Sequence, residues 1–189
     1  MARYDIQAAL KIDGWMDEFE LDWLARQAQN HYRIVEVGSY KGRTTRCLAD
    51  NCPGLVYAFD DWKGPREKFY VNGECIWPDF SSLWTEFQLN LANHLITRKV
   101  RVIEGDHGDT SIIPPQFLRG EDHEKPDMVF IDGSHDYEQV KRDLLIWDAR
   151  LGKHGLMCGH DSSWDGVKQA LAEVHGSWKV IPLTDIWVV

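Results

Sequence analysis

The stretch "VFIDGSHDYEQVKRD", residues 129–143, decides the fold because it joins a buried strand to a helix through a polar turn. Its first three residues continue the apolar run of "PDMVFIDG", residues 126–133, which is typical of a strand inside a sheet. Polar side chains then dominate residues 132–137, and apolar residues recur at helical spacing further on, at Val140, Leu144, Leu145 and Trp147. The stretch therefore predicts a strand, a polar turn and a helix, with the polar groups at the carboxyl end of the strand.

The same alternation of strand and helix patterns extends in both directions along the 189 residues. Strand patterns occupy residues 33–38, 55–60, 99–105, 126–133 and 155–161. Helical patterns occupy residues 16–30, 44–51, 83–95, 136–151 and 165–176. Residues 178–189 read as two strands around a tight turn. This order predicts one α/β domain over residues 1–189, with a doubly wound, mostly parallel sheet and an antiparallel strand at its C-terminal end.

Local signals refine the ends of these elements. Asp17 with Glu20 three positions later fits a capping box at the start of the first helix, within a helical segment over residues 1–30. Thr44 and Asp136 are expected to cap the helices that follow them. Residues 62–82 contain Gly, Pro and aromatic residues without clean periodicity. We expect an irregular excursion there, placed as a lid over a substrate.

Composition and charge argue against several classes of protein. The formal net charge of −9 disfavours a nucleic-acid binder, which needs a basic surface to neutralise phosphates. No window of 18 uninterrupted apolar residues is present, and the first residues lack the pattern of a secretory signal. The four cysteines show no CxxC spacing, which argues against a zinc knuckle. We expect a cytoplasmic protein that acts on a small molecule, binds neither nucleic acid nor membrane, and is compatible with a homo-oligomer.

The turn after the first strand, "VEVGSYKGRTT", has the spacing of a ligand-binding loop without diphosphate. Gly38 and Gly42 give GxxxG rather than the GxGxxG of dinucleotide sites, and Glu36 would repel phosphate but attract a cation. Asp60 ends the second strand, where a carboxylate is placed to bind ribose hydroxyls. A ligand with a ribose and a positive group, such as S-adenosylmethionine, fits this pattern. The alternative is that the two glycines only build a tight turn.

The motifs "EVGSYKGRTT", "FDDW", "VFIDGSHDYEQVKRDLLIW" and "GLMCGHD" together resemble the class I S-adenosylmethionine-dependent methyltransferases. The similarity runs from Trp15 to about Val180 and is greatest to macrocin O-methyltransferase-like and cephalosporin-hydroxylase-like proteins. The resemblance implies a Rossmann-like, seven-stranded sheet whose last strand is antiparallel. It also implies S-adenosylmethionine as the cofactor, with contacts at Glu36, Gly38, Ser39, Gly42, Asp60, Trp62, Asp106 and His107.

Two strand ends carry carboxylates that predict a metal site. Asp132 ends one strand and Asp161 the next, and neighbouring strands lie about 5 Å apart. Carboxylates this close repel each other unless a cation lies between them, and oxygen ligands suit Mg²⁺ or Ca²⁺. His160 would add a nitrogen ligand for Mn²⁺ or another transition ion. Alternatively, each aspartate caps the helix that follows it.

Metal-dependent catechol O-methyltransferases, which this arrangement resembles, have a general base three residues after the first carboxylate. His135 stands at that position in place of lysine, and Ser162 replaces an asparagine ligand. The resemblance implies Asp132 and His135 as catalytic residues; a purely structural hydrogen bond is the alternative for His135.

The expected reaction is metal-assisted methyl transfer to the hydroxyl of a small molecule. Four aromatic residues of the 62–82 excursion are candidates to cover the acceptor: Phe69, Tyr70, Trp77 and Phe80. For Trp77 and Phe80, a role as a cover for the sheet edge fits slightly better. Two rival functions are an NAD(P)-dependent oxidoreductase, disfavoured by the missing GxGxxG, and a non-catalytic protein that binds the cofactor.

Overall fold

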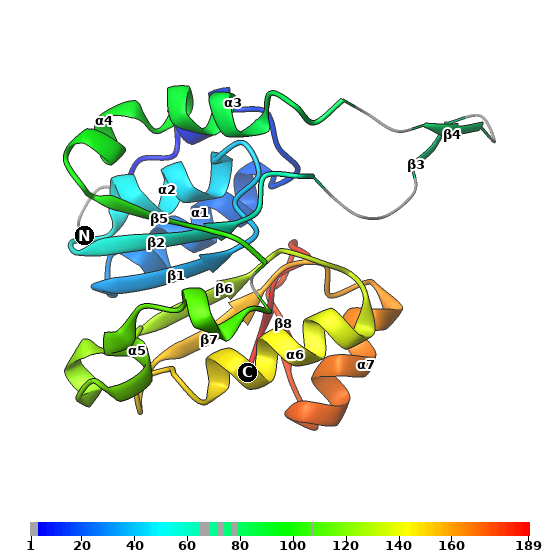
Figure 1. Cartoon of the computed structure of the whole chain (residues 1–189). Helices are drawn as coiled ribbons and strands as arrows, with labels where there is room; N and C mark the ends of the chain where they lie inside the picture. Colours follow the sequence, from blue (N-terminus) through cyan, green and yellow to red (C-terminus); the bar gives the residue numbers. More distant parts are fainter. Residues whose placement is uncertain (1–3, 65–68, 72–73, 77–78, 107) are drawn as a thin grey trace.

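A seven-stranded sheet forms the centre of the molecule (Figure 1). The computed structural model describes residues 4–64, 69–71, 74–76, 79–106 and 108–189. The strand order is β5-β2-β1-β6-β7-β9-β8. The strands are β1 (Arg33–Val37), β2 (Leu55–Asp60), β5 (Val100–Glu104), β6 (Met128–Ile131), β7 (Leu156–Gly159), β8 (Lys179–Val180) and β9 (Trp187–Val188).

The first five strands of this sheet run parallel, and β9 pairs antiparallel with both β7 and β8. The predicted mostly parallel sheet with a C-terminal antiparallel strand is confirmed. The strand order reverses between β1 and β6. Open α/β sheets bind their ligands at such a reversal, beyond the carboxyl ends of the strands. The residues of the candidate site lie at this edge, at or just after the carboxyl ends of β1, β2, β6 and β7.

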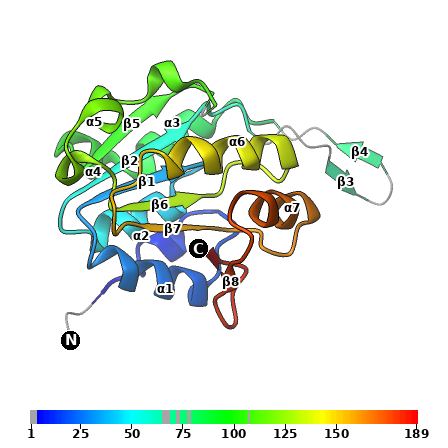
Figure 2. The same cartoon turned by 90° about the horizontal axis from the view of Figure 1, so that it is seen from below.

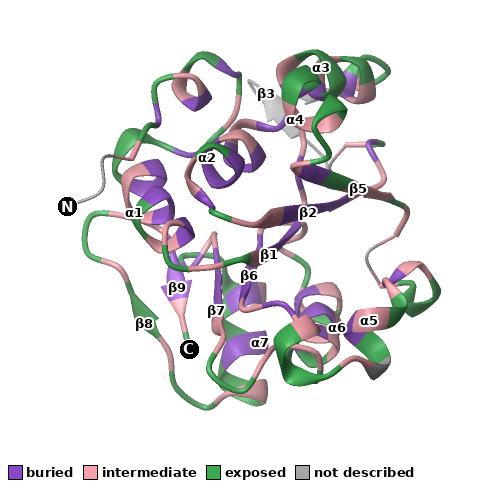
Figure 3. Cartoon of the chain, turned by 90° about the vertical axis from the view of Figure 1, so that its left-hand side faces the viewer, coloured by how far each residue is buried: buried purple, intermediate pink, exposed green. Residues whose placement is uncertain are grey.

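Helices cover both faces of the sheet and create two hydrophobic cores (Figures 1 and 3). One face is covered by α1 (Glu18–Ala28), α2 (Arg43–Asn51), α3 (Leu83–Asn90) and α4 (Ala92–Ile96). The other face is covered by α5 (Pro115–Arg119), α6 (Tyr137–Asp148) and α7 (Asp165–Val174). The strands serve both cores because successive side chains point to opposite faces: Ile34 joins the first core, and Val35 and Val37 join the second.

The described residues also form three single-turn 3-10 helices, at Ala9–Lys11, Thr110–Ile112 and Asp122–Glu124. In the described part of the chain, no helix combines the length and the apolar character needed to cross a membrane.

The predicted irregular excursion contains a short hairpin. β3 (Phe69–Val71) and β4 (Glu74–Ile76) pair antiparallel as a separate two-stranded sheet, which projects away from the main sheet in Figures 1 and 2. Phe80 packs against the first core, as expected for a residue that covers the sheet edge. Trp77 lies outside the described residues. A lid over the substrate stays a prediction.

The helix ends confirm two of the predicted caps and correct a third. Asp17 and Glu20 form the expected capping box, and the Asp136 side chain accepts from the backbone N–H groups of Glu138 and Gln139. Thr44 does not cap α2, since the helix begins one residue earlier and its N-cap is Gly42, with a φ of +88°. A left-handed backbone at this position favours glycine.

Two helical patterns were read incorrectly in detail. The single helix expected over residues 83–95 is divided into α3 and α4 at Leu91, whose φ of −107° and ψ of 10° leave the helical range. Leu145 is 52% exposed, whereas Asp143 is fully buried. Each residue advances about 100° around a helix, so the stripe that buries Val140, Leu144 and Trp147 includes position 143 and leaves position 145 outside.

Candidate active site

The glycine loop, residues 38–42 between β1 and α2, is packed closely against its neighbours. Gly38 has a φ of +86°, and a Cβ atom there would lie 2.2 Å from the backbone oxygen of Asp132. A Cβ atom on Gly42 would lie 2.3 Å from the Leu91 side chain. Gly38 therefore lets the loop reach the end of β6, and Gly42 lets it pack on α3. Both glycines have a structural reason, and their predicted contact with a cofactor stays a prediction.

Asp60, at the carboxyl end of β2, holds the glycine loop through its backbone. One carboxylate oxygen accepts from the N–H groups of Ser39 at 2.7 Å and Tyr40 at 2.8 Å, and the other accepts from the N–H of Trp62 at 2.7 Å. Burial raises the pKa of Asp60 against the opposing effect of these three hydrogen bonds. Tyr40 and Trp62 have left-handed backbones, with φ values of 47° and 48°. A ribose hydroxyl bound to Asp60 would donate a further hydrogen bond to this carboxylate, beside the three from the backbone.

Trp62, another predicted cofactor contact, lies in the first core rather than on an open surface. Its ring is 4.7 Å from that of Trp84 and 4.9 Å from that of Phe87, measured between centroids. Its indole N–H donates to the backbone oxygen of Tyr40 at 3.0 Å. Through that hydrogen bond, Trp62 helps to fix the position of Tyr40 in the glycine loop.

Glu36 lies fully buried on β1, immediately beneath the glycine loop. Its Oε2 accepts from the hydroxyl groups of Ser39 at 2.7 Å and Thr45 at 2.5 Å. Its Oε1 is buried and has no hydrogen-bond partner among the described residues. Burial raises the pKa of Glu36 to about 8, and the charges of Asp132 and Asp60 act in the same direction. A positive group nearby would stabilise the ionised form of this carboxyl group and lower its pKa.

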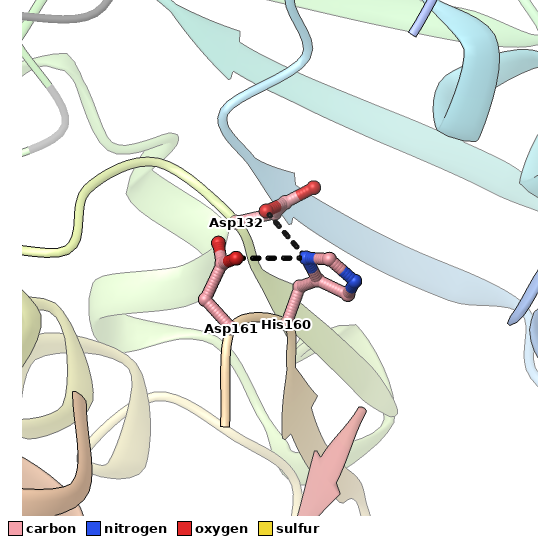
Figure 4. A group of neighbouring side chains, drawn as sticks. All are labelled: Asp132, His160 and Asp161. Atoms are coloured by element: carbon pink, nitrogen blue, oxygen red, sulfur yellow. Dashed lines mark ion pairs between the residues drawn. The ribbon is translucent and has the colours of Figure 1, made fainter. Parts of the chain in front are cut away.

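The predicted pair of aspartates does come together, and a nitrogen of His160 faces both carboxylates (Figure 4). Ile131 of β6 pairs with Gly159 of β7, so the residues that follow both strands emerge at the same edge. Nδ1 of His160 is 3.3 Å from Asp161 Oδ1 and 3.7 Å from Asp132 Oδ1. We call these three residues the Asp–His–Asp cluster.

Neither aspartate of the cluster caps a helix. Asp136 caps α6, and the N-cap of α7 is Trp164, which makes no side-chain cap. Asp161 has a left-handed backbone with a φ of 61°, and Figure 4 shows its carboxylate turned toward Asp132 and His160. Both helix-cap alternatives are therefore wrong.

The donor set of the cluster fits a divalent ion. One ligand atom from each residue can be chosen so that all three lie within 4.8 Å of one another. Oxygen ligands at about 2.1 Å from a small ion are separated by about 3 Å when adjacent and about 4.2 Å when opposite. Small side-chain adjustments would bring the three atoms into that range.

In the cluster, the carboxylates and the imidazole rings shift one another's pKa values. Burial raises the pKa of Asp132, the carboxylate of Asp161 adds to this, and His160 and His135 oppose it. Burial acts in the same direction on Asp161, but hydrogen bonds from His135 and His160 hold its pKa well below the usual range. Burial alone would lower the pKa of His160, yet its hydrogen bonds to Asp161 and Glu20 raise it to about 11.

His135, the predicted general base, is held at the rim of the cluster. Its Nε2 is 2.7 Å from Asp161 Oδ2, and its ring stacks on Trp164 with a centroid distance of 4.1 Å and an interplanar angle of 13°. Its backbone oxygen is in close contact with Gly166, where a Cβ atom would lie only 2.2 Å away. The side chain is 27% exposed. The structural hydrogen bond is present, and it leaves a catalytic role open.

Two residues of this region were missed by sequence reasoning. The sequence predicts Glu20 only as a capping residue, and no pattern singles out Trp164. Nε2 of His160 lies 2.9 Å from Oε1 of Glu20, a contact between residues 140 positions apart. No local pattern identifies a partner so far away in the sequence. The only signal was that Glu20 is a carboxylate in the helix before the first strand, from which it can reach the sheet.

Asp106 follows β5 and forms a small turn. Its Oδ1 accepts from the N–H of Gly108 at 2.8 Å and lies 3.3 Å from Nη2 of Arg142 on α6. His107, the other residue predicted there as a cofactor contact, lies outside the described residues. Asp106 thus connects the end of β5 to the helix that follows Asp132.

Comparisons with known proteins agree with this geometry. A family model described as a methyltransferase domain matches residues 35–162, which include the glycine loop and the Asp–His–Asp cluster. No curated protein gives a significant sequence match.

Among solved structures, the chain is similar to a TDP-rhamnose 3'-O-methyltransferase of calicheamicin biosynthesis, with 20% identity, a TM-score of 0.61 and coverage of 90% of this chain and 76% of that one. It is similar to an O-methyltransferase from Bacillus cereus in complex with SAH (14% identity, TM-score 0.64, coverage 96% and 84%). It is also similar to a precorrin-6y C5,15-methyltransferase from Geobacter metallireducens (13% identity, TM-score 0.64, coverage 100% and 97%). At these identities the likeness establishes the fold.

Proposed function

This chain belongs to the methyltransferase domain family, and from that premise we propose that it is an S-adenosylmethionine-dependent O-methyltransferase acting on a small-molecule hydroxyl. The observation that carries the choice of oxygen as acceptor is the Asp–His–Asp cluster beside the glycine loop. A divalent ion held by two carboxylates and an imidazole would bind a hydroxyl group and lower its pKa, which activates oxygen as the methyl acceptor.

The residues around the glycine loop fit the cofactor. S-Adenosylmethionine supplies an electrophilic methyl group on a sulfonium, and it carries a second positive charge on its ammonium. The buried, unpartnered Oε1 of Glu36 is an acceptor suited to such a positive group. Asp60 and Asp106 lie at the ends of β2 and β5, on the same edge of the sheet. They are the candidates for the ribose and adenine ends of the molecule.

Asp132, Asp161 and His160 would hold a divalent ion, which when bound lowers the pKa of a coordinated hydroxyl. His135 would accept the proton of that hydroxyl. Asp161 and Trp164 fix its ring at the rim of the cluster, and its partial exposure leaves room for an acceptor to approach. The protein's own contribution is alignment of acceptor and methyl group, which supplies about 7–11 kcal/mol in well-oriented reactions.

The test combines binding and turnover. Calorimetry should show binding of S-adenosylhomocysteine, and crystals soaked with Mn²⁺ should give an anomalous peak within about 2.5 Å of Asp132 or Asp161. Methyl transfer to a panel of phenols, sugars and polyketide alcohols should stop on chelation of the metal. Asp132→Asn should abolish the Mn²⁺ peak, and Asp165→Asn, a fully exposed aspartate on α7, is the matched control.

The rival functions give different results in the same experiments. A non-catalytic binding protein would bind S-adenosylhomocysteine but show no metal peak and no turnover on any acceptor. An oxidoreductase would bind NADH in preference to S-adenosylhomocysteine. Either result would overturn the proposed activity.

A further inference from the structure

The Glu20 carboxylate on α1 connects three parts of the chain. It is 5% exposed. Its Oε2 accepts from the N–H of Asp17 at 2.9 Å, which completes the capping box. Its Oε1 accepts from the N–H of Asp185 at 2.9 Å and lies 2.9 Å from Nε2 of His160. The first two contacts are structural, and the third reaches into the Asp–His–Asp cluster.

The contact with Glu20 determines which nitrogen of His160 would keep its proton when a metal ion binds the ring. An ionised carboxylate can only accept hydrogen bonds, so Nε2 must be the donor. Nδ1 faces carboxylates as well, so both nitrogens carry protons in the absence of an ion, and a bound metal ion would displace the Nδ1 proton and take up the lone pair. Nδ1 is also the atom that faces the two aspartates, at 3.3 Å and 3.7 Å (Figure 4). The backbone of the histidine is fixed too, because its N–H donates to Ile131 and its oxygen accepts from the Trp187 indole.

We propose that Glu20 is a positioning residue that makes His160 a nitrogen ligand, so that the cluster prefers a transition ion such as Mn²⁺ over Mg²⁺. The inference rests on the proposed function, because it concerns the same metal site. A carboxylate that accepts from the second nitrogen of a metal-bound histidine fixes the ring and increases the basicity of the ligand. An imidazole ligand in turn favours transition ions over Mg²⁺, which prefers oxygen.

A merely structural role for Glu20 makes a different prediction. If Glu20 only caps α1 and binds the loop before β9, its substitution would lower the stability of the protein without changing which metal it prefers. The ratio of the Mn²⁺ and Mg²⁺ dissociation constants is therefore the deciding quantity. Glu18→Gln is the matched control, since Glu18 is exposed in the same turn of α1 and carries the same charge.

The experiment measures Mn²⁺ affinity by electron paramagnetic resonance of the free ion, and Mg²⁺ affinity by competition, on purified full-length protein. In Glu20→Gln we expect Mn²⁺ affinity to fall about 10–100-fold, with a smaller loss for Mg²⁺. Binding of S-adenosylhomocysteine should stay unchanged, and Glu18→Gln should behave as the wild type. Equal losses for both ions, or no loss, would overturn the inference and leave the proposed function intact.

A measurement on the wild type keeps the proposal testable if Glu20→Gln does not fold. Long-range ¹H–¹⁵N spectra of the histidine rings in the Zn²⁺-loaded protein should show His160 protonated at Nε2. A proton on Nδ1 would overturn the inference. A wild-type protein that binds none of the three ions would instead refute the metal site itself, and with it the metal-assisted part of the proposed function.

Discussion

The buried carboxyl group of Glu36 should make the stability of this protein depend on pH in a direction that can be worked out from the structure. The side chain is fully buried, one oxygen accepts from two hydroxyl groups, and the other has no partner within the described part of the chain. Burial raises its pKa from the ordinary 4.5 to about 8. The native state therefore holds this proton more tightly than the unfolded chain does.

The sign and size follow from that difference. Protonated Glu36 contributes its stability fully below about pH 4.5, and this contribution is lost as the pH rises through about 8. A difference in pKa of one corresponds to about 1.4 kcal/mol, so the change from 4.5 to about 8 sets an upper bound of roughly 5 kcal/mol. Such a change is a large fraction of the total stability of a typical domain.

The variant that isolates this effect is Glu36→Gln, which is neutral at every pH and keeps an acceptor for Ser39 and Thr45. We expect its free energy of unfolding, relative to wild type, to increase by several kcal/mol between pH 5 and pH 9. Urea unfolding at a series of pH values measures this difference, in which titrating groups that do not interact with Glu36 cancel. Glu18→Gln, on the exposed face of α1, should show no such trend. A constant difference between wild type and Glu36→Gln across this range would refute the reasoning.

Three further changes test the loop and the site. Gly38→Ala should lower the free energy of unfolding by about 2 kcal/mol or more, because the new Cβ would lie 2.2 Å from a backbone oxygen. Gly176 is also left-handed, but a Cβ atom there would have nothing within 4 Å. Gly176→Ala should therefore lower the free energy of unfolding only by the cost of the strained backbone, about 1 kcal/mol. Equal losses in thermal melts of the two variants would rule out the packing argument. Asp60→Ala should weaken binding of S-adenosylhomocysteine by about 1–3 kcal/mol in calorimetry, and unchanged affinity would remove Asp60 from the site. His135→Gln should reduce methyl transfer about 10²–10⁴-fold while cofactor and metal still bind; near-normal turnover would leave positioning and metal activation as the whole mechanism.

The parts of the fold that could be read from the sequence are those set by local periodicity and by general rules of topology. The pattern "LVYAFD" predicted β2 at its observed bounds, Leu55–Asp60. The meeting of Asp132 and Asp161 was predictable because the carboxyl ends of neighbouring parallel strands share one edge. Asp136 as a cap was predictable because its side chain acts on the next turn of its own chain.

The parts that could not be read depend on side-chain choices made by distant neighbours. The ribose contact of Asp60 stays a prediction, whereas its three hydrogen bonds from backbone N–H groups of the adjoining loops could not be read from the sequence. The N-cap of α2 is Gly42 and not Thr44. The side chains of Leu91 and Phe87 approach Gly42 so closely that they leave no room for a Cβ atom, and the sequence does not reveal these neighbours. The role of Glu20 beside His160 depends on a contact that no local pattern encodes.

The hydrogen bonds of Glu20 also bear on the order in which the molecule is completed. They span 140 and 165 residues, joining the first α-helix to the end of β7 and to the loop before the last strand. Contacts this distant in the sequence form slowly, because the chain must close a long loop before they stabilise it, so we expect these bonds to form after the units they connect. During synthesis α1 is made long before His160 and Asp185, the two residues that its Glu20 contacts. The contacts of Glu20 with His160 and Asp185 form only after translation has passed these residues, and we expect the complete cluster late in folding.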